Sequence, residues 1–388
     1  MTRKIAVVVT ARPSYARVKT VLQAIQDHPD LELQLIVAAS ALLERYGNVA
    51  EVMRADGFEP VMEVHMVVEG ETPLTSTKTV GLGIVEMSNV FHYLKPDAVI
   101  SVADRYETIT TAISAAYMNI PIAHIQGGEV TGSIDEKVRH AVTKLSDMHL
   151  VSNQNAAKRV IKMGEQRDSV HVTGCPSTDL AAWVVRKDND PQLKASLEHH
   201  VRRGVGEPID PNSDYILCMQ HPVTYEWTDA AVQVRETLQA VHESGLPCYW
   251  FWPNVDAGSD QTSKAIRMFR EMNAVHNIHF LKNMPPETFL YMLANSRCII
   301  GNSSTGICEA SFLGVPTVNI GSRQLGRECG KNVLHVSHNH LEISEALQRQ
   351  LAHGRYESDQ VYGDGKAGPR IAALLAEENL STEKKLAY

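Results

Sequence analysis

Short apolar runs that alternate with amphipathic segments are the feature of this sequence that most constrains its fold. Residues 4–10, 31–38, 98–102 and 120–125 have the pattern of buried strands, and each run is followed by a segment with apolar residues at helical spacing. Repeated alternation of strand and helix is typical of a parallel sheet with helices on both faces. We therefore expect the chain up to Thr173 to form a doubly wound α/β domain.

The same rhythm resumes after a polar stretch at residues 186–213, and 388 residues are ample for two domains, each with its own core. The pattern predicts a first α/β domain (1–176), a linker region (177–213), a second α/β domain (214–368) and a C-terminal helical tail (369–388). Within the first domain, residues 69–80 are polar and contain glycine and proline, so we expect a loop there and a helix only from about Val80 to Leu94.

Charge and hydropathy exclude two classes of partner. The chain has 37 basic and 45 acidic residues and no long run of one sign, so neither nucleic acid nor an anionic membrane surface is an expected partner. No stretch of about 18 apolar residues occurs, and a strand pattern begins at Lys4 without a preceding signal peptide. The sequence therefore predicts a cytoplasmic protein with no membrane association.

Cysteine and histidine residues do not form a metal-binding motif. The six cysteines include no C-x-x-C pair, and the 17 histidines include no H-E-x-x-H. Cys218, Cys248 and Cys298 lie inside apolar strand patterns, where a buried reduced thiol is the ordinary interpretation. We expect no metal and no cofactor.

Residues 120–150 place polar groups where a strand gives way to a helix. The apolar run ends before Gln126 and Glu129, and Ser133 with Glu136 has the spacing of a capping box at the start of a helix that begins near Asp135. That helix is expected to end near Asp147, with Arg139 on its solvent side. Ligands bind at this edge of open parallel sheets, so these polar residues are candidate site residues.

A second pair of charged residues follows the strand at 98–102. Asp104 and Arg105 come directly after it, and the sheet edge that they share is that of Gln126 and Glu129. An alternative remains open, in which Asp104 caps the next helix and pairs with its neighbour. Arg12 follows the first strand and is either an anion ligand or a solvated arginine.

The second domain contains the best candidate for an anion site. Residues 301–306, GNSSTG, lie between a strand and a helix, where small residues, hydroxyls and free backbone N–H groups favour phosphate, although the same pattern is also a plain helix cap. Glu309 is expected one helical turn further on, where a carboxylate accepts from a ribose diol. Arg323 follows the next strand, and His221 follows the first strand of this domain. Carboxylates on one domain and phosphate ligands on the other suit a sugar nucleotide held in a cleft.

Several motifs together resemble the hydrolysing UDP-N-acetylglucosamine 2-epimerases of the sialic or legionaminic acid pathway type. These motifs are ADRYE (103–107), HIQGGEVTGSIDEKVRHAVTKLSD (124–147), GCPSTD (174–179), QHPVT (220–224), PNVDAGSD (253–260), GNSSTGICEA (301–310) and NIGSRQLGRECGKNVLHV (319–336). The resemblance implies a glycosyltransferase-B-like fold of two Rossmann-like domains, the first with the catalytic carboxylates and the second binding the nucleotide. It also implies that the protein needs no metal and forms a homodimer or homotetramer. The implied reaction eliminates the nucleotide diphosphate to a glycal, which water then hydrates with inversion at C2.

The resemblance also implies roles for particular residues. Catalytic acids fall on Asp104 and Asp135, with Gln126, Glu129 and His221 as further catalytic candidates. The uracil, ribose and phosphate contacts fall on Arg12, Arg105, Asn254, Ser303, Ser304, Glu309 and Arg323, and Arg17 stands where some members have a lysine.

Gln126 departs from the family pattern, which has a catalytic glutamate at this position. An amide does not exchange protons as a carboxylate does. We therefore hypothesise that Gln126 hydrogen-bonds a substituent such as a 4-acetamido group, and that proton transfer falls to Asp104, Glu129 or Asp135. The nucleotide, UDP or GDP, stays open, as do two other functions: a glycosyltransferase of the same fold and a catalytically inactive sugar-nucleotide sensor.

Overall fold

A computed structural model describes residues 2–44, 48–70, 72–102, 105–131, 135–187, 189–253, 258–273 and 275–387 of the chain. The chain forms two compact units. Unit 1 comprises Met1–Glu129, Ile134–Asp179 and Tyr362–Tyr388, and unit 2 comprises Val130–Ser133 and Leu180–Val361.

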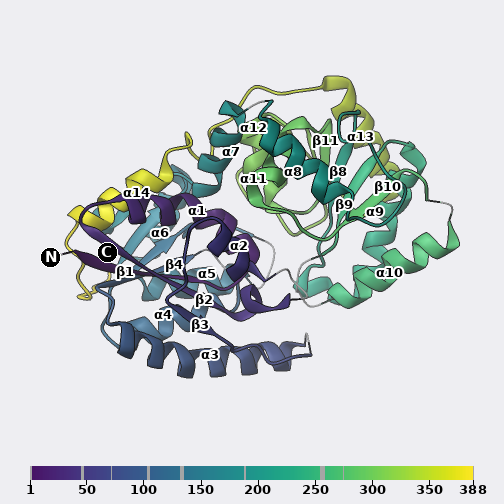
Figure 1. Ribbon diagram of the computed structural model, residues 1–388. Helices are drawn as coiled ribbons and strands as arrows, with labels where there is room; N and C mark the ends of the chain where they lie inside the picture. The colour runs from purple at the N-terminus through teal and green to yellow at the C-terminus, as the bar shows by residue number, and fades with distance from the viewer. Residues whose placement is uncertain are drawn as a thin grey trace. The chain divides into compact units, whose positions relative to one another are not determined.

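The described part of unit 1 is built on a seven-stranded parallel sheet with strand order β3-β2-β1-β4-β5-β6-β7 (Figure 1). The order reverses between β1 and β4, so the carboxyl ends of these two strands flank a topological switch point. The strands are β1 (Arg3–Val9), β2 (Leu31–Ala38), β3 (Met62–Val64), β4 (Ala98–Val102), β5 (Ile122–Ile125), β6 (Met148–Val151) and β7 (Val170–Val172).

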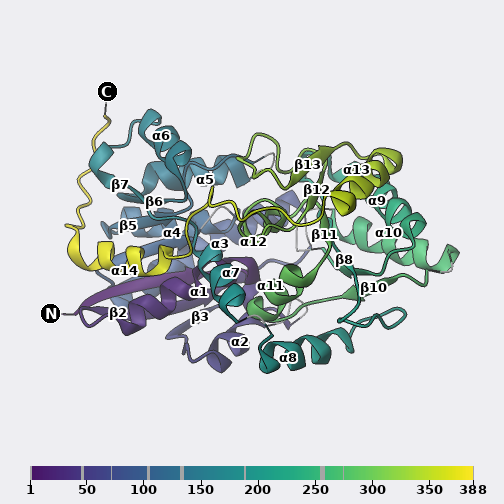
Figure 2. The ribbon, with the colours of Figure 1, turned by 90° about the horizontal axis from the view of Figure 1, so that it is seen from above.

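Helices cover both faces of this sheet because the strands are apolar on both sides. In β1, Ile5 and Val7 pack with α1 and α14, while Ala6 and Val8 pack with α3 and α4 on the other face. Helix α14 lies beside α1 in both views (Figures 1 and 2). The helical segments are α1 (Arg12–Asp27), η1 (Ala39–Leu42), α2 (Val49–Ala55), α3 (Pro73–Leu94), α4 (Thr108–Tyr117), α5 (Asp135–Leu145), α6 (Gln154–Lys162), η3 (Arg167–Ser169) and α14 (Ala367–Glu377).

The described part of unit 2 has a six-stranded parallel sheet in the order β10-β9-β8-β11-β12-β13. The strands are β8 (Ile216–Met219), β9 (Cys248–Phe251), β10 (Ile278–Leu281), β11 (Cys298–Gly301), β12 (Thr317–Ile320) and β13 (Val333–Val336). The helical segments are α7 (Pro176–Arg186), which enters unit 2 from unit 1, α8 (Pro191–Val201), η4 (Thr224–Asp229), α9 (Ala230–Ser244), α10 (Ser259–Met272), α11 (Pro286–Asn295), η5 (Ser304–Gly306), α12 (Glu309–Leu313) and α13 (His340–His353). Two parallel sheets, each layered with helices, are the α/β class that the sequence predicts.

The structure divides the chain differently from the expected domains. The expected linker, 177–213, contains α7 and α8, and apolar residues such as Leu180 and Leu197 pack in the core of unit 2. The C-terminal residues 362–388 belong to unit 1, where Ile371 and Leu375 of α14 are buried against the sheet. Polar composition suggested a linker because α8 buries only one face, with Leu193, Leu197 and Val201.

The expected loop at 69–80 is wrong, because α3 begins at Pro73. Thr72 and Thr75 form a reciprocal capping box in which Thr75 N–H donates to Thr72 Oγ1 over 3.2 Å and Thr72 N–H donates to Thr75 Oγ1 over 3.0 Å. Pro73 occupies the first turn, where its missing N–H leaves no unpaired donor. The polar residues that suggested a loop are thus a helix start.

Two further findings concern the described residues. All six cysteines are among them, and none forms a disulfide. Cys218, Cys248 and Cys298 are buried as predicted, and burial raises the pKa of the Cys218 thiol.

Within the described ranges, no helix combines the length and the apolar character needed to cross a bilayer.

Candidate active site

The candidate site residues of unit 1 follow three adjacent strands. Arg12 comes after β1, Arg105 after β4, and the loop Gln126–Glu129, here named the QGGE loop, after β5. Because β1, β4 and β5 are parallel neighbours, these residues lie at one edge of the sheet, as the sequence predicts.

The QGGE loop is buried although it is polar. Glu129 is 1% exposed and Gln126 is 3% exposed. Gly128 has φ +74°, and a Cβ at this position would lie 2.4 Å from the carbonyl oxygen of Ala156. The loop therefore packs against the backbone of α6 at a point where only glycine fits.

Gln126 has a constrained backbone and a tethered side chain. Its φ is +66°, a left-handed conformation that is uncommon for a residue with a side chain. Its Nε2 donates to Cys175 Sγ over 2.8 Å, and that sulfur lies 3.0 Å from Ser177 Oγ. Gln126 Oε1 is buried and accepts no hydrogen bond from any residue that the structure describes. The amide thus carries an unused acceptor within the candidate site, and buried polar groups without partners are rare in proteins.

A side chain of helix α5 binds the backbone of the QGGE loop. Arg139, which the sequence placed on the solvent side of the helix, is 1% exposed; its guanidinium donates to the carbonyl oxygen of Glu129 over 2.8 Å and to Glu136 Oε2 over 2.9 Å. That prediction was wrong because helical spacing assigns a face from apolar residues alone and misses an arginine that binds a loop backbone. Thr143 Oγ1 of the same helix lies 3.2 Å from Nδ1 of His124, which is two residues before the loop.

Of the predicted acids, Asp135 is the first residue of α5 and is half-buried. Asp104 and the predicted capping residue Ser133 lie outside the described residues. Arg105 Nε donates to Glu107 Oε1 over 2.7 Å, and Glu107 is 1% exposed. Sequence reasoning missed this buried carboxylate, although it lies within the ADRYE motif.

Arg12 is a half-buried cation that has no acidic partner among the described residues. It is the first residue of α1, and Pro13 after it is compatible with the first turn of a helix. Burial lowers the pKa of Arg12 to about 10, and no described residue forms an ion pair or hydrogen bond with its guanidinium. Such a group favours an anionic ligand. Arg17 is a half-buried residue of the same helix.

In unit 2 the candidate residues follow β8, β11 and β12, which are again adjacent. Asn302 organises them: its Oδ1 accepts from His221 N–H and its Nδ2 donates to the His221 carbonyl oxygen, both over 2.8 Å. Its own carbonyl oxygen accepts from Arg323 over 3.2 Å and from Gln324 over 2.9 Å. Sequence reasoning included His221 and Arg323 but missed Asn302, which is fully buried.

The GNSSTG segment is a turn of 3₁₀ helix rather than a direct entry into α12. Gly301 has φ +122°, and a Cβ there would lie 2.2 Å from the carbonyl oxygen of Met219, so the segment requires glycine. Ser303 caps η5, its Oγ accepting from Thr305 N–H over 3.3 Å, and Ser304 is the first residue of η5. Glu309 is the first residue of α12 rather than one turn inside it, and it is half-buried. Since α12 is only five residues long, the donors that this segment offers are local N–H and hydroxyl groups more than a helix dipole.

Two remaining predictions concern Asn254 and metals. Asn254 lies outside the described residues. Among the side chains that the structure describes, no group of three or more His, Cys, Asp or Glu residues is arranged to hold a metal ion.

Comparison with known proteins identifies the family. The family model for UDP-N-acetylglucosamine 2-epimerase matches residues 23–376. The chain belongs to this family. Its resemblance to the family, based on the motifs, is thereby confirmed.

Two curated relatives of the epimerase are similar over nearly the whole chain. The UDP-N,N'-diacetylbacillosamine 2-epimerase (hydrolyzing) of Legionella pneumophila is 31% identical over 375 residues, which cover 97% of this chain and 96% of the relative. The UDP-N-acetylglucosamine 2-epimerase of Neisseria meningitidis is 30% identical over 365 residues, covering 94% of this chain and 91% of the relative.

Solved structures of 2-epimerases have the same fold. The Neisseria meningitidis UDP-GlcNAc 2-epimerase bound to UDP-GlcNAc has a TM-score of 0.80 and 18% identity, with 97% of this chain and 100% of that chain covered. The Methanocaldococcus jannaschii enzyme in complex with UDP-GlcNAc and UDP has a TM-score of 0.79 and 15% identity, with the same coverage. The two-domain, glycosyltransferase-B-like fold expected from the sequence is thus confirmed.

Proposed function

We propose that this protein is a hydrolysing 2-epimerase of a nucleotide-linked N-acetyl amino sugar. It cleaves the C1–O bond to the nucleotide diphosphate and inverts C2, so that the product is the free mannosamine-type sugar. Relatives that carry the word hydrolyzing in their names support this subtype, among them the Legionella protein and a GDP/UDP-N,N'-diacetylbacillosamine 2-epimerase from Campylobacter jejuni, 26% identical over 345 residues.

The first step needs a leaving group that is stabilised as negative charge develops. The groups that Asn302 holds together in unit 2 are donors of the right kind: His221, the hydroxyls of Ser303 and Ser304, and the Arg323 guanidinium. Such fixed donors stabilise a departing diphosphate without reorganising during the reaction. Glu309 is suited to a ribose diol, and within unit 1 the half-buried Arg12 is a cation suited to an anionic ligand.

Proton removal from C2 falls to the carboxylates of unit 1. No carbonyl acidifies the C2 proton, so a base removes it only as positive charge builds on the sugar ring. Asp104, Asp135 and Glu129 are the candidate bases and acids, and Arg105, paired with Glu107, lies at the same sheet edge. Water then adds to the glycal, with a proton delivered to C2 on the opposite face.

The Gln126 amide is the observation that supports our choice of sugar substrate. Its nitrogen is engaged by Cys175, and its buried oxygen is an acceptor without a partner among the described residues. A 4-acetamido N–H is a matching donor, and the Legionella relative is named for a substrate with such a group. We therefore propose a 4-acetamido-4,6-dideoxy sugar, as in N,N'-diacetylbacillosamine, as the preferred substrate and N-acetylglucosamine as the poorer one.

The experiment offers UDP- and GDP-linked forms of both sugars to the protein in deuterated water and follows the reaction by NMR. The expected result is free nucleoside diphosphate together with a free manno-configured sugar that carries deuterium at C2, formed faster from the 4-acetamido substrate. If the product is instead the C2 epimer still linked to the nucleotide, the protein is a non-hydrolysing epimerase and the proposal is wrong. Sugar transfer without C2 exchange, or no turnover at all, would contradict the proposal.

A further inference from the structure

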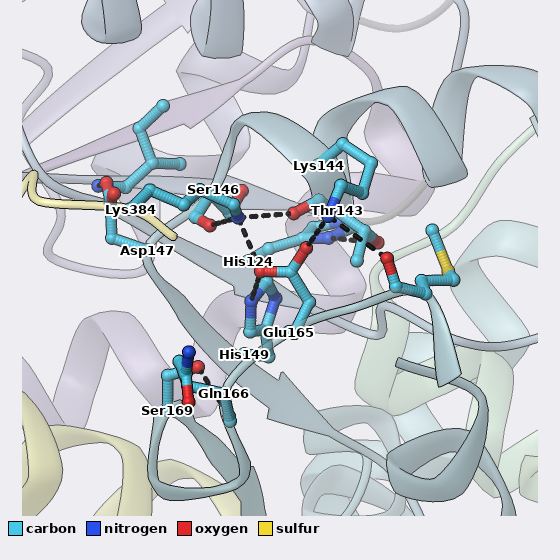
Figure 3. A network of polar contacts seen from close by, with 12 residues as sticks. His124, Thr143, Lys144, Ser146, Asp147, His149, Glu165, Gln166, Ser169 and Lys384 are labelled. Atoms are coloured by element: carbon cyan, nitrogen blue, oxygen red, sulfur yellow. Dashed lines mark hydrogen bonds and ion pairs between the residues drawn. The ribbon is translucent and has the colours of Figure 1, made fainter. Parts of the chain in front are cut away.

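The last residues of the chain form a strap along unit 1. The strap, residues 381–387, follows α14 and reaches the turn after α6, where Ala387 N–H donates to the Gly164 carbonyl oxygen over 2.9 Å. Figure 3 shows Lys384, on the yellow C-terminal segment, pointing into a cluster of polar side chains. The strap therefore brings a cation to a part of unit 1 that is distant in sequence.

Lys384 binds the carboxyl end of α5. Its Nζ donates to the Ser146 carbonyl oxygen and lies 3.4 Å from that of Thr143. Carbonyl groups at the end of a helix lack partners within the helix, and a lysine there both satisfies them and complements the negative end of the helix dipole. The strap thus adds a cation to a helix end at which Ser146 Oγ already donates to the Val142 carbonyl oxygen over 2.7 Å.

A buried carboxylate fixes the position of Lys384. Glu165 is 3% exposed, and its Oε2 lies 2.5 Å from Lys384 Nζ and 3.0 Å from His149 Nε2. Its Oε1 accepts from Lys144, whose Nζ also donates to the Met163 carbonyl oxygen over 3.1 Å. One carboxylate thus holds two lysines, one on α5 itself and one on the strap (Figure 3).

The other contacts of α5 lead to the candidate active site. Thr143 lies against His124 through its hydroxyl, and Arg139 donates to the backbone of Glu129 in the QGGE loop. Asp135 is the first residue of the same helix. A shift of α5 along its axis would therefore move a candidate acid and the support of the QGGE loop together.

We propose that Lys384 is a positioning residue for the half-site of unit 1: by anchoring the carboxyl end of α5, the C-terminal strap sets the placement of Asp135 and the QGGE loop. The effect on activity rests on the proposed function, whereas the effect on α5 does not.

The test compares K384M and K384R with K385M in the full chain. Lys385 is the exposed neighbour, for which the structure shows no ion pair, so K385M is the matched control. Hydrogen exchange reports the order of α5 without any substrate. In K384M, we expect amides of α5 and the QGGE loop to exchange faster, while unit 2 and β1 of unit 1 keep their protection.

Turnover provides the second measurement. Misplacement of a catalytic group by a fraction of an ångström to 1 Å costs up to about a hundredfold, so K384M should lower kcat about ten- to a hundredfold. Its affinity for UDP should match that of K385M, because none of the expected nucleotide ligands lies on α5 or in the QGGE loop. K384R should restore both kcat and protection, since a guanidinium offers the same carbonyl and carboxylate bonds.

The outcomes separate this inference from the proposed function. If the unaltered protein turns over no sugar nucleotide but K384M loosens α5 alone, the proposed function fails and the anchoring of α5 stands. Wild-type exchange and kcat in K384M would overturn the inference. Loss of exchange protection throughout unit 1 in both K384M and E165Q would also overturn the inference. The strap would then stabilise unit 1 as a whole and would not specifically position α5.

Discussion

Asn302 and His221 exchange two hydrogen bonds, with the side-chain amide of Asn302 pairing with the backbone N–H and carbonyl oxygen of His221, each over 2.8 Å. The amide replaces the next rung of the ladder between β8 and β11 at the point where both strands end. It therefore fixes the loop after β8 to the loop after β11, which carry His221 and the GNSSTG segment.

Replacement of Asn302 by leucine should weaken both stability and nucleotide binding. The change removes both hydrogen bonds between Asn302 and the His221 backbone, at a cost of about 2–4 kcal/mol in the free energy of unfolding. UDP affinity, measured by calorimetry, should fall at least about tenfold because the phosphate ligands lose their common support. Asn339→Ala, which removes the cap of α13, is the control; it should cost about 1 kcal/mol and leave UDP affinity unchanged. Equal UDP affinity in the two variants would contradict the role of Asn302.

Arg12→Met should have opposite effects on stability and binding. Burial lowers the pKa of Arg12 to about 10, so the charged guanidinium destabilises the folded protein at neutral pH. Removing it should leave the Tm unchanged or raise it, while the affinity for UDP and the UDP-sugar falls about tenfold or more. Arg54→Met, which removes an exposed arginine that pairs with Glu59 and Glu63, should change neither affinity. A lower Tm with unchanged affinity would show that Arg12 has a structural role instead.

Gln126→Glu should reduce the preference for the 4-acetamido substrate. A carboxylate cannot donate to Cys175 Sγ, and burying its charge is costly. The ratio of kcat/KM between the 4-acetamido substrate and UDP-N-acetylglucosamine should fall about tenfold or more, as expected when a buried polar contact to the substrate is lost. Gln126→Met, which has neither donor nor acceptor, should shift the ratio in the same direction. An unchanged ratio in both variants would remove Gln126 from substrate selection.

The buried cluster at Glu165 should make the protein sensitive to acid. Burial raises the pKa of the Glu165 carboxyl, but hydrogen bonds from a histidine and two lysines bring it down to about 2, while burial lowers the pKa of His149. Both groups bind fewer protons in the folded than in the unfolded chain, so stability falls as pH falls, first below about 6.5 and then between about 4.3 and 2.

Urea unfolding between pH 7.5 and pH 2 measures this dependence. Glu165→Gln should flatten the decline below about pH 4.3, since the amide binds no proton in either state. Glu345→Gln, at an exposed position of α13, serves as the control. The cluster does not govern acid sensitivity if the two variants lose stability in parallel.

The fold could be predicted because strands that are apolar on both faces must be covered by helices on both sides of the sheet. Strands β2 and β4 have the bounds that the sequence indicates, and every position of β4 is buried. The start of α3 was missed because Thr72 and Thr75 satisfy backbone groups that a polar composition seemed to leave in a loop.

The site could be predicted in part. Residues that follow strands, such as Gln126 and His221, were found because parallel topology places them at one edge. Asn302 and Arg139 were missed in their roles, because each binds a backbone group that only the folded chain brings near. Spacing along the sequence carries no signal for such contacts.

The return of residues 362–388 to unit 1 has a consequence for how the protein is made. Unit 2 draws almost entirely on one continuous segment, Leu180–Val361, so its residues leave the ribosome together. Unit 1 begins first but lacks α14 and Lys384 until residues 362–388 are synthesised, and α14 covers apolar residues of α1 and the sheet. Domains generally fold as units during synthesis, with the N-terminal one first. In this protein unit 2 has all its residues before unit 1 does, so the apolar face of unit 1 that α14 covers stays accessible to chaperones until residues 362–388 emerge.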